Sequence, residues 1–78
     1  MNLTQLRAFH AVAEAGSFSL AARTGGISQP TLSAQVKALE ATYGTGLFDR
    51  HGRGVRLTPV GQSLHAVTTR LFAAEEEA

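Results

Sequence analysis

With 78 residues and a formal net charge of +1, the chain is long enough for one small domain. A chain this short buries only about 60% of the surface that its unfolded form exposes, so we expect a thin core. It has no cysteine, no apolar run long enough to span a bilayer and no signal-peptide pattern, so we expect a cytoplasmic domain without disulfides, thiolate metal sites or membrane contact. Residues 1–58 carry six Lys or Arg against three Asp or Glu, and residues 59–78 carry one against three, so a mildly basic body, compatible with binding nucleic acid, precedes an acidic tail.

The first predicted element is a helix from Leu3 to Ala15. Asn2 with Gln5 is a candidate capping box, and Gly16 is a candidate stop. Apolar and partly apolar residues recur at helical spacing, which predicts the buried face. This stripe consists of Leu3, Leu6, Phe9, His10 and Ala13.

A short second helix and a longer third helix follow. The second begins at the capping residue Ser17 and ends at "TGG", residues 24–26. The third is predicted over residues 28–43, with Ser28 as N-cap and Pro30 in its first turn. Its apolar stripe is Leu32, Val36, Leu39 and Tyr43. A short helix, a glycine turn and a longer helix are typical of a helix-turn-helix, here over about residues 18–37.

A β-hairpin and a long helix complete the chain. Val55 and Leu57 alternate with polar residues after the turn "HGRG", so a hairpin flanked by arginines is predicted over residues 48–57. The last helix, residues 59–78, has Thr58 as N-cap and Pro59 at its first position. Spacings of four and three along it indicate a helix-pairing seam. The seam residues are Val60, Leu64, Val67, Leu71 and Ala74.

The expected fold is therefore mainly α. Residues 1–58 form a winged helix-turn-helix of three helices plus a short β-hairpin wing, and residues 59–78 form a linker and dimerisation helix. The exposed face of the third helix is short-chained and delays its first charge to Lys37. Such a face suits the major groove, which admits one helix and is read by glutamine, serine and threonine side chains.

Four stretches of the sequence, "LTQLRAFHAVAEAGSFSLAA", "ISQPTLSAQVKALE", "GLFDR" and "RGVRLTPVG", cover nearly the whole chain. In these residues the chain resembles the N-terminal DNA-binding region of the LysR-type transcriptional regulators. The resemblance implies a bacterial, nucleoid-associated regulator that binds double-stranded DNA, requires no cofactor, and forms a homodimer through its linker helix. It also implies a C-terminal domain, absent from this chain, that binds a small-molecule inducer, and a possible tetramer of the full-length protein.

The resemblance assigns roles to individual residues. It implies major-groove contacts for the start of the third helix, backbone contacts for Lys37 and Arg50, and a wing contact with the minor groove or a phosphate for Arg53. The groove residues are Gln29, Pro30, Thr31 and Ser33. For Arg50 an ion pair with Asp49 or Glu40 is the alternative.

Two positions depart from the family pattern. Ala34 stands where the family commonly has arginine, so one DNA contact is lost or moved to Gln35 or Lys37. Gly25 stands where the family has leucine before the recognition turn, which removes a core side chain and loosens the second helix.

The long seam predicts a symmetric partner, because the body is too small to cover it. Such a homodimer would read an interrupted palindrome with half-sites about one helical turn apart. Other functions are less well supported: His10, His51 and His65 lack metal-ligand spacing, and no nucleophile elbow or nucleotide loop indicates an enzyme. A protein-binding winged helix would need an exposed apolar patch, and the acidic end argues against a membrane-surface helix.

Overall fold

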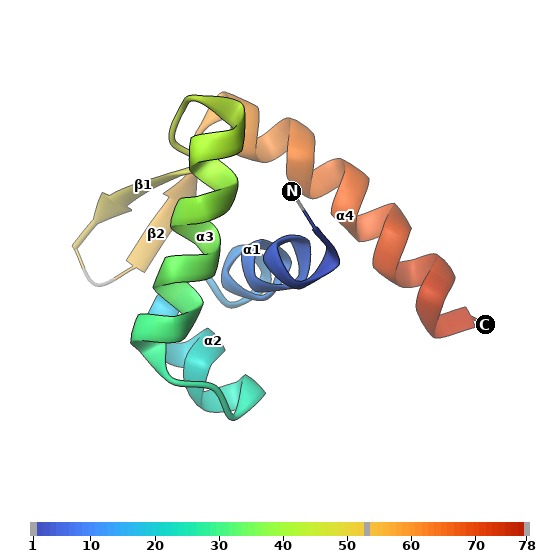
Figure 1. The fold of residues 1–78 in the computed structure, drawn as a ribbon, viewed down its shortest axis with the longest axis horizontal. Coiled ribbons are helices and arrows are strands. Elements are labelled where there is room, and N and C mark those ends of the chain that lie inside the picture. The colour runs from blue at the N-terminus through green and yellow to red at the C-terminus, as the bar shows by residue number, and fades with distance from the viewer. Residues whose placement is uncertain (1, 53, 78) are drawn as a thin grey trace.

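The computed structural model describes residues 2–52 and 54–77. Within these ranges the chain forms four helices and one two-stranded antiparallel hairpin. The elements are α1 (Leu3–Ala15), α2 (Phe18–Gly25), α3 (Gln29–Tyr43), β1 (Phe48–His51), β2 (Gly54–Leu57) and α4 (Pro59–Glu77). Figure 1 shows α1 at the centre, α2 below it, α3 and the hairpin to its left, and α4 running diagonally along its right side to the C-terminus. This is the expected winged helix-turn-helix with a long final helix.

The helices begin and end where the capping residues predict. The side chains of Asn2, Ser17 and Ser28 accept hydrogen bonds from backbone N–H groups three residues ahead, at 2.9 to 3.2 Å. Thr58 does the same for α4, accepting from the N–H of Gly61 at 3.1 Å. The capping box at Asn2 is only half formed, because Oε1 of Gln5 is buried without a hydrogen-bond partner.

The core consists of two clusters that meet at α1. Ala8 and Val12 of α1 pack with α2 and the first half of α3, whereas Phe9 packs with the second half of α3, Leu47 and Leu64 of α4. Adjacent residues of one helix therefore serve two different neighbours. The predicted α1 stripe was wrong at Leu3, which is 48% exposed, and it missed Val12, which is fully buried. A helix covered on two sides buries a wider face than a single stripe describes.

The α3 stripe is confirmed at Leu32, Val36 and Leu39, all at most 2% exposed. Tyr43 differs, since it is 39% exposed at the C-terminal end of α3. There it lies beside Val60 and Val67 of α4, which line the same shallow pocket. The last residue of the stripe, Tyr43, thus lies outside the core and next to the surface of α4.

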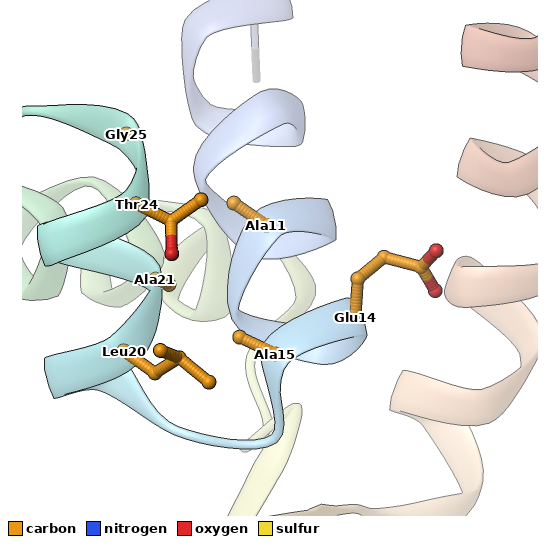
Figure 2. A pocket seen from close by; sticks show the side chains of 7 residues that line it. All are labelled: Ala11, Glu14, Ala15, Leu20, Ala21, Thr24 and Gly25. Atoms are coloured by element: carbon orange, nitrogen blue, oxygen red, sulfur yellow. The ribbon is translucent and has the colours of Figure 1, made fainter.

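Gly25 borders an open apolar pocket between α1 and α2. The pocket has a volume of about 370 Å³, and Figure 2 shows Ala11 and Ala15 of α1 facing Leu20, Thr24 and Gly25 of α2 across it. A second pocket, lined in part by Ala8, Ile27 and Leu32, also borders Gly25. A residue without a side chain therefore stands where the body has unfilled apolar surface.

We predict that Gly25→Ala stabilises the domain. A Cβ at this position would meet only Cγ2 of Ile27, at an ordinary contact distance of 3.6 Å. Because glycine costs a helix about 0.5–1 kcal/mol relative to alanine, the free energy of unfolding in urea should rise by about that amount. The matched control is Gly26→Ala, which should lower the free energy of unfolding because Gly26 has φ +65°. A Gly25→Ala variant as unstable as Gly26→Ala would contradict this reasoning.

Candidate nucleic-acid interface

The N-terminal face of α3 presents the residues expected at the major groove. Gln29, Pro30, Thr31 and Lys37 are exposed, and Ser33 is half-buried. All five stand on one helix whose opposite face is fixed by Leu32, Val36 and Leu39 in the core. The protruding face is therefore held rigidly, while its side chains remain open to a ligand.

Hydrogen bonds within the helix-turn-helix orient two of these side chains. Oγ of Ser19 in α2 donates to Oε1 of Gln29 at 3.2 Å, and Oγ of Ser28 donates to Oγ1 of Thr31 at 2.7 Å. One lone pair of the Gln29 oxygen and both hydrogens of its amide nitrogen stay available. The hydroxyl hydrogen of Thr31 is likewise available. Sequence reasoning missed Ser19, whose only signal was its place at the start of the helix that precedes the recognition turn.

Arg50 on β1 is anchored by an aromatic ring of α2. Its guanidinium sits 4.6 Å from the centre of the Phe18 ring. Phe18 contacts Phe48 edge to face at 5.8 Å between ring centres, and Phe48 contacts Phe9 at 5.2 Å. The exposed cation thus rests on a column of three phenylalanines that ends in the core. Cation–π contacts of this kind restrict the positions that an arginine adopts.

The ion pair considered for Arg50 does not form in the part of the chain that the structure describes. Glu40 instead accepts a hydrogen bond from the backbone N–H of Leu47 at 2.7 Å, which secures the segment entering β1. Asp49 is exposed and pairs across the hairpin with Arg56 in the strand register. Neither ion pair among the described residues involves Arg50, so no carboxylate neutralises its charge there.

The hairpin is docked against the turn between α1 and α2. The N–H of Val55 donates to the carbonyl of Gly16 at 3.0 Å. A Cβ on Gly54 would lie 2.8 Å from the same carbonyl oxygen, so only glycine permits this approach. The contact ties the wing to the start of α2 and thus to Phe18. Arg53 and the side chain of His51 lie outside the described residues.

The seam of α4 divides into exposed and buried members. Val60, Val67 and Leu71 are 40 to 49% exposed, and Ala74 is exposed as well. Leu64 is only 8% exposed because it packs with Phe9, Leu39 and Leu47, so most of its surface is unavailable to a partner. Tyr43, which the sequence reading assigned to the α3 stripe, joins the exposed seam through the pocket that it shares with α4.

His10 and His65 lie between α1 and α4, with 5.5 Å between their ring centres. Burial lowers the pKa of His10 below its ordinary value, because desolvation disfavours the charged ring. Among the described residues no group of three His, Cys, Asp or Glu side chains is arranged to hold a metal ion. No helix in the described ranges is long and apolar enough to cross a membrane.

Residues 3–62 match the protein family described as bacterial regulatory helix-turn-helix protein, lysR family. The HTH-type transcriptional regulator BudR of Raoultella terrigena is 46% identical over 78 residues, which are all of this chain and 27% of that protein. The regulator TfdT of Cupriavidus pinatubonensis is 52% identical over 62 residues, which are 80% of this chain and 27% of that protein. The chain thus spans only a minor part of the length of these two relatives.

Solved structures agree with this match over almost the whole chain. The CbnR_DBD–DNA complex superposes with a TM-score of 0.87 at 38% identity, covering 99% of this chain and 88% of that one. The BenM_DBD/catB site 1 DNA complex gives a TM-score of 0.91 at 38% identity, covering 99% and 86%. The expected family and fold are confirmed. The chain belongs to the LysR family of bacterial regulatory helix-turn-helix proteins and has the fold of their DNA-binding domains.

Proposed function

We propose that the chain binds double-stranded DNA sequence-specifically, with α3 as the recognition helix in the major groove. The observation that carries this proposal is the exposed N-terminal face of α3, where Gln29 and Thr31 are oriented by neighbouring serines yet retain free donors and acceptors. A glutamine amide can bond an adenine edge through both its oxygen and its nitrogen. Two solved relatives of the same fold are complexes with DNA, which supports the proposal.

The cationic groups around this face supply the backbone contacts. Lys37 follows the groove-reading residues along α3, and Arg50 is held on Phe18 at the neighbouring strand. Arg53 at the wing turn completes the proposed set by reaching the minor groove or a phosphate. Contacts with phosphates fix the position of the protein on the duplex, whereas contacts with base edges supply the sequence preference.

We further propose that two chains pair through α4. Val60, Val67, Leu71 and Ala74 form an exposed apolar strip along a helix of 19 residues. Pairing about a two-fold axis would bury both strips and present two recognition helices to one side of the duplex. The expected operator is an interrupted palindrome with half-sites about one helical turn apart.

The proposal includes a whole protein that is longer than this domain. The matched residues cover 27% of the length of BudR and 27% of the length of TfdT, so residues 1–58 and 59–78 would be the DNA-binding domain and the linker helix of a longer bacterial regulator. A small-molecule inducer would bind a further C-terminal domain, and the full-length protein would form the dimer or tetramer in the cytoplasm. The isolated chain should bind DNA without responding to an inducer.

The experiment that tests the function is selection from randomised double-stranded DNA, followed by fluorescence anisotropy on the enriched sequence across a salt series. Enrichment of an interrupted palindrome, with affinity falling steeply as salt rises, would establish a dimeric reader of sequence. Binding without enrichment would overturn sequence-specific recognition by this domain.

Gln29→Ala should weaken binding to the enriched operator and relax the preference at one base position. Loss of a bidentate contact costs about 1–3 kcal/mol of discrimination against the wrong base. The matched control is Gln62→Ala, an exposed glutamine of α4 away from the recognition face, which should bind as the parent does. Equal losses on operator and random DNA would refute base reading by Gln29.

Arg50→Ala and Arg53→Ala should each lower affinity for all sequences alike. If each arginine neutralises one phosphate, the slope of log affinity against log salt should fall by about 0.9 for each variant. Arg70→Ala on α4 removes an exposed arginine outside the proposed interface and should leave the slope unchanged. A variant of Arg50 or Arg53 with the parental slope makes no phosphate contact.

Leu71→Asp should separate the dimer while leaving the winged helix folded, because it places a charge in the exposed strip. Sedimentation measures the oligomeric state, and circular dichroism reports the fold. Ala66→Asp is the control, since it adds the same charge to an exposed residue of α4 outside the strip. Survival of the Leu71→Asp dimer at micromolar concentration would remove this strip from the interface.

A further inference from the structure

The second half of α4 is joined to α1 by polar and aromatic contacts rather than by aliphatic packing alone. We name this set of contacts the α1–α4 clamp. It consists of Arg7, His10 and Glu14 of α1 with His65, Thr68, Phe72 and Glu75 of α4. None of these residues lies on the recognition face or belongs to the exposed strip of α4.

Thr68 is the centre of the clamp. It is fully buried, and its hydroxyl donates to the carbonyl of His65 at 3.2 Å while lying 2.9 Å from Nδ1 of His10. In the tautomer that carries its proton on Nδ1, His10 donates to the hydroxyl oxygen while the hydroxyl donates to the carbonyl; in the other tautomer the hydroxyl donates to Nδ1. The ring of His10 also contacts Phe72, with 5.1 Å between ring centres. A fully satisfied buried hydroxyl at a helix interface accepts only one relative placement of the two helices.

Charged groups close both edges of the same interface. On one edge the guanidinium of Arg7 lies 4.9 Å over the ring of Phe72 and pairs with Glu75. On the other edge Nε2 of His65 lies 2.9 Å from Oε2 of Glu14. The clamp therefore has a directional contact at three successive levels along α4, from His65 through Thr68 to Glu75.

A small tilt of α4 would be amplified along its length. Its 19 residues span about 28 Å at 1.5 Å per residue, so a tilt of about 10° moves its far end by about 5 Å. That displacement exceeds the rise of one base pair, about 3.4 Å. In a pair of chains held together by α4, the angle between α4 and the body sets the distance between the two recognition helices.

We propose that His10 and Thr68 are positioning residues that fix the angle of α4 and thereby determine which half-site spacing the dimer reads. This role rests on the proposed function, since it requires a dimer that binds two half-sites. Aliphatic packing at position 68 would hold α4 against α1 by buried area. The buried hydroxyl adds directional contacts with His10 and with the carbonyl of His65, and these contacts restrict the angle further.

The angle itself is measurable without DNA. Because the chain contains no cysteine, Ala41→Cys on α3 and Ala73→Cys on α4 give two exposed sites for spin labels. Pulsed dipolar spectroscopy, with labelled chains diluted in unlabelled chains, then reports the distance between α3 and the end of α4. Thr68→Val should broaden or shift that distance distribution, and Thr68→Ser, which keeps the hydroxyl, should restore the parental one. Thr69→Val, at the exposed neighbouring residue, is the control.

Spacing selectivity is measured next, on the enriched operator and on versions with one base pair added or removed between the half-sites. The parent should prefer its own spacing, and Thr68→Val should reduce that preference by about tenfold while binding a single half-site with parental affinity. Thr68→Ser and Thr69→Val should keep the preference.

Two outcomes would overturn the spacing role. Either the distance distribution of Thr68→Val equals that of the parent, or the distribution changes and the spacing preference does not. If the parent enriches no operator at all, the proposed function fails and the spacing role with it, while the label distances still decide whether the clamp fixes α4.

Discussion

The structure depends on the burial of α1 from two sides. Ala8 and Val12 are covered by α2 and α3, and Phe9 is covered by α3, Leu47 and Leu64. A domain of this size has few core residues, so a helix shared by both clusters is the element through which one side of the molecule is positioned relative to the other. Both α3 and α4 pack on α1 and take their orientation from it (Figure 1).

A small number of contacts also holds the wing against the body. One backbone hydrogen bond, from Val55 to Gly16, and one aromatic column, ending at Phe18, attach the hairpin to the turn that starts α2. Since Gly54 leaves no room for a side chain there, the hairpin approaches the body closely enough for Arg50 to reach Phe18. Arg50 and the start of α2 are consequently held together.

Local sequence signals predicted the elements well, and long-range contacts account for what they missed. Ser17, Ser28 and Thr58 marked three helix starts correctly, because a cap depends on residues only three positions away. Leu64 was grouped with the exposed seam, because spacing along one helix does not reveal which neighbour covers each residue. The contact between Phe18 and Arg50 spans 32 positions and has no sequence pattern of its own.

Charged side chains have different partners on the two sides of the domain. Two polar contacts among the described residues join α1 to α4: the ion pair of Arg7 with Glu75, and the contact between Nε2 of His65 and the carboxylate of Glu14. Glu14 and Glu75 on that side are thus engaged, whereas Lys37 and Arg50 face the proposed DNA side with no carboxylate among the described ion pairs. A net charge of +1 attracts a duplex only weakly, so where the charges stand matters more than their sum. In the proposed complex, this separation would orient the domain on the duplex, and the uncharged face of α3 would supply the sequence preference.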